Sequence, residues 1–364
     1  MRVSVDGTPL LGTRSGVGRY VDRLMATLSV TQPRPELRLT AFTARGAGKL
    51  PMYPGVAIRH RPVPARLLQF SWMRSDVPPV EWLAGECDVF HATNFVLPPT
   101  RRAAGVVMIH DLTWALHADT VTAAVERYRK LVPRSVRRAA VVVCPARATA
   151  NDVTDYFDLE PSKVVVTPHG VDRSWLETPR PDPGQRMRLG LPTRYVIAVG
   201  TREPRKNLQV VVEAHALARR ADPVVVPPLV IVGAAGWGPE LTPRPDVTIT
   251  GFVEDSTLRA AVAGADCLVL ASRYEGFGMP LLEALGCGTP VVASDLAVHR
   301  EVCGPHASFV PVGDAGGLAE VLISTLADGR DEASDRLRRE WAAQWTWERC
   351  AGATLEAYQK AATT

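Results

Sequence analysis

The sequence has little lysine, no paired cysteines and no long apolar run. Lysine accounts for only five of the 42 basic residues, and the six cysteines lie apart without a Cys-x-x-Cys pair, which supports neither a disulfide framework nor a zinc site. No apolar run approaches the roughly 18 residues that cross a membrane. The opening MRVSVDGTPLL predicts a strand and a turn instead of a signal peptide. A net charge of +4 does not indicate nucleic acid. We therefore expect a cytoplasmic globular protein with reduced, buried thiols.

Two further motifs are absent. No Asp-x-Asp follows a predicted strand, so we expect no divalent metal and no other cofactor. The glycines of GTRSGVGRY (12–20) do not form the G-x-G-x-x-G fingerprint of dinucleotide-binding enzymes. An NAD-dependent oxidoreductase is therefore disfavoured.

Length and pattern predict two domains. The 364 residues exceed what one core usually supports. Short apolar runs that alternate with helical spacing predict parallel sheets covered on both faces. We expect an α/β fold of two facing Rossmann-like domains, residues 1–175 and 186–343, joined by the proline-rich ETPRPDPGQ at 177–185.

The expected elements can be given by residue range. Strands are predicted at 2–7, 37–42, 56–63, 88–93, 105–111 and 140–146, and then at 195–200, 228–234, 247–252, 267–272, 290–295 and 308–313. Helices are predicted at 18–28, 208–221, 256–265 and 317–327, whereas 61–82, rich in proline and aromatic residues, is expected to be irregular.

The strongest candidate for a ligand-binding site is a single glycine-rich turn. SRYEGFGMP (272–280) follows a predicted strand and precedes a helix, where open parallel sheets bind ligands. Gly276 and Gly278 let backbone N–H groups approach a ligand, and the helix N-terminus favours phosphate. Glu275 and Glu283 flank this turn, so a nucleotide sugar, with phosphates between two hydroxylated rings, fits the arrangement. The alternative is that both glutamates are ordinary surface charges.

The segment ASRYEGFGMPLLEALGCGTPVVASD resembles the E-x7-E signature of retaining glycosyltransferases of family 4. The resemblance extends to VGTREPRKNLQVVVEAHALA (199–218), LVIVGAAGWG (229–238), VTITGFVEDSTL (247–258), VVVTPHGVD (164–172) and VVMIHDLTW (106–114). It implies the GT-B fold with a deep interdomain cleft, and a helix at 344–364 that packs back on the first domain. It also implies a hexosyltransferase that needs no metal.

The resemblance further implies roles for the residues of the turn. Glu275 would contact hydroxyls of the donor sugar, and Glu283 would hold the ribose. Backbone groups of the turn would line the sugar and phosphates, Leu282 would pack near the ribose, and Val253 would meet the nucleobase. The backbone groups are those of Gly276, Phe277, Gly278 and Met279.

The segment REPRKN (202–207) follows the first strand of the second domain. Arginine and lysine there can neutralise a diphosphate leaving group. Lys206 matches the family lysine, whereas Thr201 replaces the usual arginine, so that Arg202 and Arg205 compete as the second cation. Surface charge is the alternative for all three.

In the first domain, His110 ends a strand and matches the family histidine that faces the donor sugar; a structural histidine is the alternative. Asp111 either orients His110 or caps the next segment, and His91 ends a neighbouring strand with either role open. Gly16 and Arg19 are expected near the phosphates or the acceptor.

The acceptor and the donor are less defined. The basic stretch at 126–139 and the apolar LLQFSWM at 67–73 fit peripheral contact with the inner face of a membrane and a lipid-linked acceptor, or a solvated arginine face over the core. The segments GTREPRKN and HATNFVLPP most resemble those of family members that transfer mannose from GDP-mannose in polysaccharide or glycolipid assembly. A UDP-sugar-dependent glucosyl or N-acetylglucosaminyl transferase is the alternative, followed by a sugar-nucleotide epimerase of the same fold.

Overall fold

The computed structural model describes residues 1–11, 16–44, 49–117 and 126–364. The chain divides into two compact units. Unit 1 comprises Met1–Leu116, Ala123–Gly170 and Thr346–Thr364, and unit 2 comprises His117–Thr122 and Val171–Trp345. Each unit contains one parallel sheet covered by helices, so the prediction of two Rossmann-like domains is confirmed.

The sheet of unit 1 has seven described strands in the order β3-β2-β1-β4-β5-β6-β7, and all of their pairings are parallel. Its central strands are buried along their whole length, because helices cover both faces. The strands are β1 (Arg2–Asp6), β2 (Glu36–Thr40), β3 (Ala57–Ile58), β4 (Val89–Ala92), β5 (Ala104–Met108), β6 (Val141–Cys144) and β7 (Val164–Val166).

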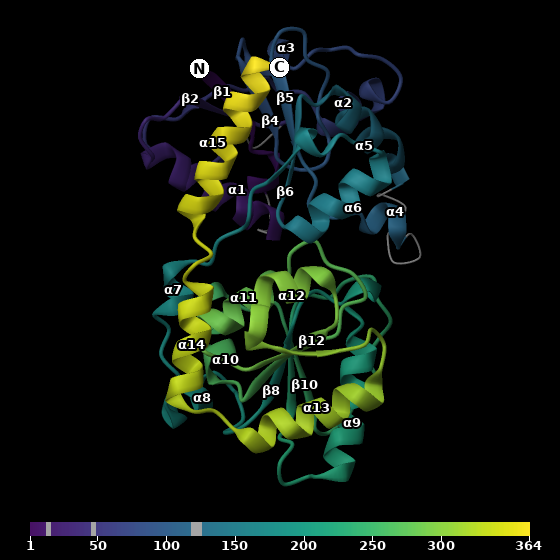
Figure 1. Cartoon of the computed structure of the whole chain (residues 1–364), viewed down its shortest axis with the longest axis vertical. Coiled ribbons are helices and arrows are strands. Elements are labelled where there is room, and N and C mark those ends of the chain that lie inside the picture. Colours follow the sequence, from purple (N-terminus) through teal and green to yellow (C-terminus); the bar gives the residue numbers. More distant parts are fainter. Residues whose placement is uncertain (12–15, 45–48, 118–125) are drawn as a thin grey trace. The chain divides into compact units, whose positions relative to one another are not determined.

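The C-terminal helix of the chain belongs to unit 1. It packs beside α1 and across β4 to β7 (Figure 1). The helices of this unit are α1 (Gly16–Val30), α2 (Ala65–Trp72), α3 (Glu81–Ala84), α4 (Thr113–Leu116), α5 (Glu126–Arg138), α6 (Arg147–Phe157) and α15 (Trp347–Thr363), with short 3-10 turns at η1 (Thr8–Leu10) and η5 (Pro161–Lys163).

The sheet of unit 2 has six described strands in the order β10-β9-β8-β11-β12-β13, again all parallel. The order places β8 beside β11, so the loops after these two strands lie at the same edge. The strands are β8 (Val196–Val199), β9 (Leu229–Val232), β10 (Val247–Gly251), β11 (Cys267–Leu270), β12 (Val291–Ser294) and β13 (Ser308–Val310).

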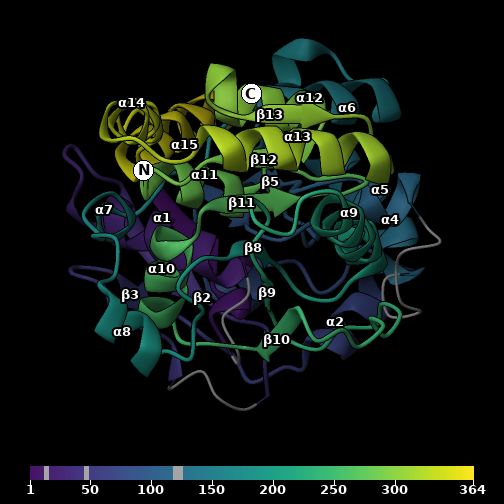
Figure 2. The same ribbon diagram turned by 90° about the horizontal axis from the view of Figure 1, so that it is seen from below.

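Helices cover both faces of this second sheet. Helices α9 and α13 share one core with strands β8, β9 and β11, while α10 and α11 lie on the other side of the sheet (Figure 2). The helices are α7 (Arg173–Leu176), α8 (Pro183–Arg188), α9 (Leu208–Ala221), α10 (Asp255–Gly264), α11 (Met279–Gly286), α12 (Ala297–Cys303), α13 (Ala315–Asp328) and α14 (Glu332–Ala342), with η6 (Pro204–Lys206) and η7 (Gly304–His306).

Two expectations about local structure need correction. The segment 61–82 is irregular only in part, since it contains α2, which begins after Pro64 and ends before the later prolines. The strand predicted at 56–63 is only two residues long. The basic stretch at 126–139 forms α5, a helix that continues through Pro133.

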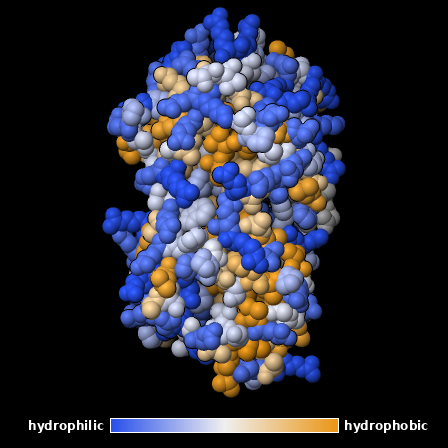
Figure 3. Space-filling model, viewed as in Figure 1, coloured by the Kyte–Doolittle hydropathy of each residue, from blue (hydrophilic) through white to orange (hydrophobic). Residues whose placement is uncertain are grey.

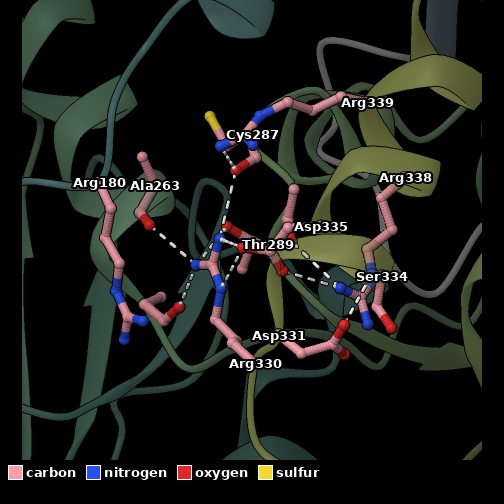
Figure 4. Close-up of polar contacts among 12 residues, drawn as sticks. Arg180, Ala263, Cys287, Thr289, Arg330, Asp331, Ser334, Asp335, Arg338 and Arg339 are labelled. Carbon is pink, nitrogen blue, oxygen red and sulfur yellow. Dashed lines mark hydrogen bonds and ion pairs between the residues drawn. The ribbon is translucent and has the colours of Figure 1, made fainter.

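A buried arginine ties three segments of unit 2 together (Figure 4). The guanidinium of Arg330, with 4% of its side chain exposed, donates to the carboxylate of Asp335 at 2.7 Å. It also donates to the carbonyls of Ala263 and Ala265 at 2.9 and 2.8 Å. Further donations reach the Thr289 hydroxyl and the Cys287 carbonyl. The loop before α14 is thereby fixed to the C-terminal ends of α10 and α11.

We expect Arg330→Lys to lower the free energy of unfolding by about 2–3 kcal/mol, because an ammonium has too few donors for these acceptors and each buried acceptor left unpaired costs on the order of 1 kcal/mol. A urea melt measures the change. Arg336→Lys in the following helix α14, where the side chain is 72% exposed, should change stability by less than about 0.5 kcal/mol. Equal losses of unfolding free energy in the two variants would show that the hydrogen bonds of the Arg330 guanidinium do not stabilise unit 2.

One face of the molecule is seen in Figure 3. In Figure 3 hydrophilic side chains separate most apolar ones on the face shown, although apolar colour gathers over α13. Within the described residues, no helix is both long and apolar enough to cross a membrane.

Candidate active site

Two loops meet at the carboxyl edge of the unit 2 sheet. One follows β8 and contains Arg205 and Lys206; the other follows β11 and contains Glu275. The N–H of Arg273 donates to the carbonyl of Arg205 at 2.9 Å, and the guanidinium of Arg205 donates to the carbonyl of Tyr274 at 3.1 Å. These cross-links hold the two loops in a fixed register, although they are about seventy residues apart in sequence.

Glu275 lies between the two cations. Its Oε1 accepts from Lys206 Nζ at 2.6 Å, and its Oε2 accepts from Arg205 Nη1 at 2.5 Å. The hydroxyl of Ser272 donates to Oε1 at 2.7 Å. Glu275 is 7% exposed and Lys206 is 9% exposed. Neither is an ordinary surface charge, which is what the alternative interpretation required.

The electrostatics of this cluster follow from its burial and its charges. Burial by itself would raise the pKa of Glu275, but the positive charges of Arg205 and Lys206 outweigh it and hold that pKa well below its usual range. The carboxylate is therefore ionised at neutral pH. Arg205 also pairs with Glu203 at 3.4 Å, so two carboxylates balance the two cations. The guanidinium and the ammonium still offer charged N–H donors to an anionic ligand.

The glycine turn leads into α11. Gly278 precedes the helix with φ +93, a conformation that favours glycine, and a Cβ added there would lie 3.4 Å from the ring of His299. Pro280 occupies the first turn, where its missing N–H costs nothing. Glu283 follows one turn into the helix and is 3% exposed. The turn thus presents backbone groups at a helix N-terminus, as a phosphate site requires.

Two residues that are predicted to contact the ligand have buried side chains. Leu282 is fully buried within α11, and the ring of Phe277 packs edge-on against Trp345 with centroids 5.6 Å apart. At Phe277 the predicted contact is through the backbone, which this packing leaves possible. The ribose contact assigned to Leu282 would need side-chain surface that is not exposed here, and it stays a prediction.

Arg202 and Val253 lie at the same edge of the sheet. The N–H of Arg202 donates to the carbonyl of Ala234 at 3.2 Å, and its own carbonyl accepts from Gly238 at 2.8 Å. A Cβ at Gly236 would come within 2.3 Å of that carbonyl, so glycine is required for this close approach. Val253 is half-buried after β10. Of the two competing arginines, it is Arg205 that contacts Glu275 beside Lys206.

In unit 1, His110 is buried at the end of β5. Its Nε2 lies 2.9 Å from the carbonyl of Thr93, and because a carbonyl only accepts, Nε2 carries the proton and Nδ1 the lone pair. Burial lowers the pKa of His110, so the ring is neutral at pH 7. The rings of Tyr20 and Phe95 stand edge-on to it, at 5.3 and 5.6 Å between centroids.

Asp111 and His91, near His110, make contacts within unit 1. Asp111 accepts from the N–H of Thr113 at 2.9 Å and so caps α4. His91 is fully buried, and its Nδ1 lies 2.8 Å from the hydroxyl of Tyr358 in α15, which is a structural contact. Gly16 is the exposed first residue of α1. The preceding residues 12–15 of the glycine loop lie outside the described residues.

The sequence did not point to Ser272 or His299. Ser272 stands three residues before Glu275 and donates to its Oε1, but a serine after a strand is too common to predict such a contact. His299, in α12, is fully buried, and its Nδ1 lies 2.8 Å from the carbonyl of Ser294, while its Nε2 has no hydrogen-bond partner among the described residues. Only the tertiary structure brings it beside Gly278.

No metal site is evident in the part of the chain that the structure describes, where no group of three or more His, Cys, Asp or Glu side chains could hold an ion. The absence of a metal requirement therefore stays a prediction.

Two family models match the chain. The model described as "Glycosyltransferase Family 4" matches residues 14–175, and that described as "Glycosyl transferases group 1" matches residues 193–328. Together they match about four fifths of the sequence, one in each unit.

Curated relatives match nearly the whole chain. The O-antigen chain mannosyltransferase B of Escherichia coli is 26% identical over 393 residues, covering 99% of this chain and 100% of the relative. The D-inositol 3-phosphate glycosyltransferase of Salinispora arenicola is 27% identical over 413 residues, covering 99% of this chain and 91% of the relative.

A solved structure shares the fold. The Anabaena protein HepE, crystallised with UDP and glucose, superposes with a TM-score of 0.66 at 17% identity, covering 98% of each chain. At this identity the likeness supports the fold alone, and the family models and relatives supply the activity. The chain belongs to glycosyltransferase family 4 and is a glycosyltransferase with the GT-B fold.

Proposed function

We propose that this glycosyltransferase moves a hexose, with retention of anomeric configuration and without a metal ion, from a nucleoside-diphosphate sugar to a hydroxyl of a glycan, glycolipid or other small acceptor. The donor that we propose is GDP-mannose. The observation that carries the proposal is the pair of cations, the part-buried Arg205 and the buried Lys206, both bonded to Glu275 beside the glycine turn.

These cations suit the departure of a diphosphate. During transfer the bond between the anomeric carbon and the phosphate oxygen breaks, and negative charge grows on the leaving group. Arg205 and Lys206 are already oriented by Glu275, so they can stabilise this charge with little reorganisation. The acceptor oxygen bonds to the same face of the anomeric carbon, and its proton passes to the leaving phosphate. This scheme needs no protein nucleophile.

The remaining residues of the proposed site keep their predicted roles. Backbone groups from Gly276 to Met279 lie at the N-terminus of α11, where they suit the phosphates, and Glu283 one turn further suits ribose hydroxyls. Val253 and Arg202 are proposed at the base and the phosphates. In unit 1, the neutral ring of His110 is proposed to contact the donor sugar.

Mannose is proposed on the relatives, whereas GDP is proposed on the resemblance of GTREPRKN and HATNFVLPP to mannosyltransferases that use GDP-mannose. The Escherichia coli relative is named a mannosyltransferase of the O-antigen chain, which supports mannose and polysaccharide assembly. The Salinispora relative is named for D-inositol 3-phosphate, which makes a phosphorylated polyol a second acceptor class. HepE was solved with UDP and glucose, which supports a UDP-sugar as the alternative donor.

Peripheral contact with a membrane at its inner face is also part of the proposal. On α2, Leu67 and Phe70 are 64% and 55% exposed. Arg134 of the basic helix α5 donates to the carbonyl of Met73 at 2.8 Å, which brings α5 beside α2. Apolar and basic side chains on neighbouring helices support binding to an anionic lipid surface.

A thermal-shift panel of GDP, UDP, ADP and TDP tests the donor. A nucleotide at 100 times its dissociation constant should add about 2.7 kcal/mol to the free energy of unfolding. We expect GDP to give the largest shift, and GDP-mannose to transfer mannose with the anomeric proton signal of a retained linkage. A larger shift with UDP would select the alternative donor. No shift with any nucleotide would overturn the proposal, and a loss of transfer in EDTA would refute metal independence.

A further inference from the structure

A cavity in unit 1 lies at the carboxyl ends of β1 and β4. Its volume is about 120 Å³, many times the roughly 10–15 Å³ that one water needs. Helices α2 and α5 close its sides. The lining residues used below are Asp6, Phe42, Gln69, Trp72, Asn94 and Tyr128.

Asp6 is the buried acid of this cavity. It ends β1, is 7% exposed, and its Oδ1 accepts from the N–H and the hydroxyl of Thr8 at 2.9 and 2.5 Å. Burial raises the pKa of Asp6 to about 6, and the bonds from Thr8 offset only part of that effect. Among the described residues no lysine or arginine forms an ion pair with it. A carboxyl in this setting is suited to exchange hydrogen bonds with neutral hydroxyls.

The other walls combine amides, a phenol and aromatic faces. Gln69 and Asn94 each offer a donor and an acceptor, and the hydroxyl of Tyr128 interacts with Asn94. The rings of Phe42 and Trp72 meet edge-on, with centroids 5.4 Å apart, and the indole N–H of Trp72 is held by the carbonyl of Pro78. Apolar walls with a few convergent polar groups are typical of sites for small hydroxylated ligands.

The cavity is coupled to His110 by direct contacts. The hydroxyl of Thr93 donates to the carbonyl of Asp6 at 2.7 Å, while the carbonyl of Thr93 accepts from His110. On the other side, the ring of Phe95 lies 5.4 Å from that of Tyr128 and 5.6 Å from that of His110. Phe95 has φ +60, a strained backbone that the fold maintains at this position. A ligand in the cavity would thus lie next to the residue proposed at the donor sugar.

The charges around the cavity decide its ligand class. No lysine or arginine is among its described lining residues. Burial raises the pKa of Tyr128, the positive charge of Arg127 opposes this effect, and Asp111 and Asp6 add to it more weakly. Of these charged residues, only Asp6 is among the described lining residues. A phosphate group needs several cations or N–H donors, and acidic neighbours repel it.

We propose that this cavity holds the acceptor, and that it accepts an uncharged, hydroxyl-rich ring such as the terminal sugar of a glycan while it excludes a phosphorylated polyol. The inference rests on the proposed function and chooses between its two acceptor classes.

The test titrates the full-length protein, with and without GDP or UDP, with methyl α-D-mannopyranoside and with mannose 6-phosphate, and follows binding by saturation-transfer NMR. The neutral glycoside should bind at least about tenfold more tightly than the phosphate. Asp6→Asn, which changes the carboxyl to an amide of the same shape, should weaken glycoside binding by about tenfold, the effect of one strong hydrogen bond. Tighter binding of the phosphate would overturn the proposal.

Two more variants keep the outcome interpretable. Gln69→Leu, at a half-buried position, should also weaken glycoside binding, so a folding failure of Asp6→Asn does not leave the question open. Asp22→Asn is the control. Asp22 is 8% exposed against 7% for Asp6, accepts from the Tyr53 hydroxyl at 2.8 Å and is not among the described lining residues, so glycoside binding should be unchanged. Unchanged glycoside binding in both cavity variants would contradict the proposal.

The two proposals can fail separately. The thermal shift with nucleoside diphosphate reports unit 2 and should be the same in Asp6→Asn and in the unaltered protein. If that shift is missing in the unaltered protein, the proposed function fails. If the shift is present but the glycoside does not bind, only the inference about the cavity fails.

Discussion

Glu275→Gln is expected to destabilise the protein by about 3–5 kcal/mol when no nucleotide is present, because it leaves the buried Lys206 without its counter-charge and Arg205 with only the more exposed Glu203. Lys206 and Arg205 both contact this carboxylate, and their side chains are only 11% and 14% exposed. Nucleoside diphosphate should bind more tightly to the variant, since it supplies the missing negative charge. Transfer should nevertheless fall, because the cations lose the group that orients them.

The pH dependence of this effect has a defined sign. The folded-state pKa of Glu275 is depressed below the ordinary value of 4.5, so its contribution to stability is present above that pH and is lost as the pH falls. Urea melts at pH 7 should therefore show the full difference between Glu275→Gln and the unaltered protein. Melts at progressively lower pH should show a shrinking one.

The control for this experiment is Glu203→Gln. Glu203 is 3.4 Å from the same Arg205 but has 19% of its side chain exposed, so the loss should stay below about 1 kcal/mol. If Glu275→Gln is as stable as the unaltered protein and binds nucleotide more weakly, then Glu275 does not act as the counter-ion of the cation pair.

Lys206→Met is expected to lower kcat by about 10²–10³-fold, as the loss of one oriented charge at a developing anion does in other enzymes. The aliphatic part of Lys206 packs beside Gly200, where a Cβ would lie 3.4 Å from its Cδ, and methionine can keep this packing. Arg205 remains to neutralise Glu275, so the fold should survive. Initial rates over a range of donor concentrations separate kcat from KM.

A loss in kcat larger than any rise in KM would show that Lys206 acts mainly on the transition state. Arg244→Met is the control, because Arg244 forms a surface pair with Asp246 at 3.1 Å with 37% of its side chain exposed. It should transfer sugar at the normal rate. Activity of Lys206→Met within about threefold of normal would refute the proposed role, since a charge at the leaving group is worth far more.

The local pattern of apolar residues was enough to predict much of the fold. The helix predicted at 208–221 is α9 with the same bounds, because its apolar positions recur at helical spacing and Asn207 and Asp222 flank it. The strands of unit 2 were found as short apolar runs. The helix α14 was missed, since its sequence EASDRLRREWA is mostly charged and its stability comes from the cap at Asp331 and the buried Arg330.

Local features of the chain were enough to predict the class of the two domains, the family, and the segments at which a nucleotide sugar would be held, because strand periodicity and the glycine turn can be read from neighbouring residues. The folded chain was needed to show that Lys206 and Arg205 neutralise Glu275, that His299 lies beside the same turn, and that Asp6 faces a cavity with no lysine or arginine among its described lining residues. These features join residues far apart in sequence, and they depend on the order of strands in each sheet and on burial, which no local pattern specifies.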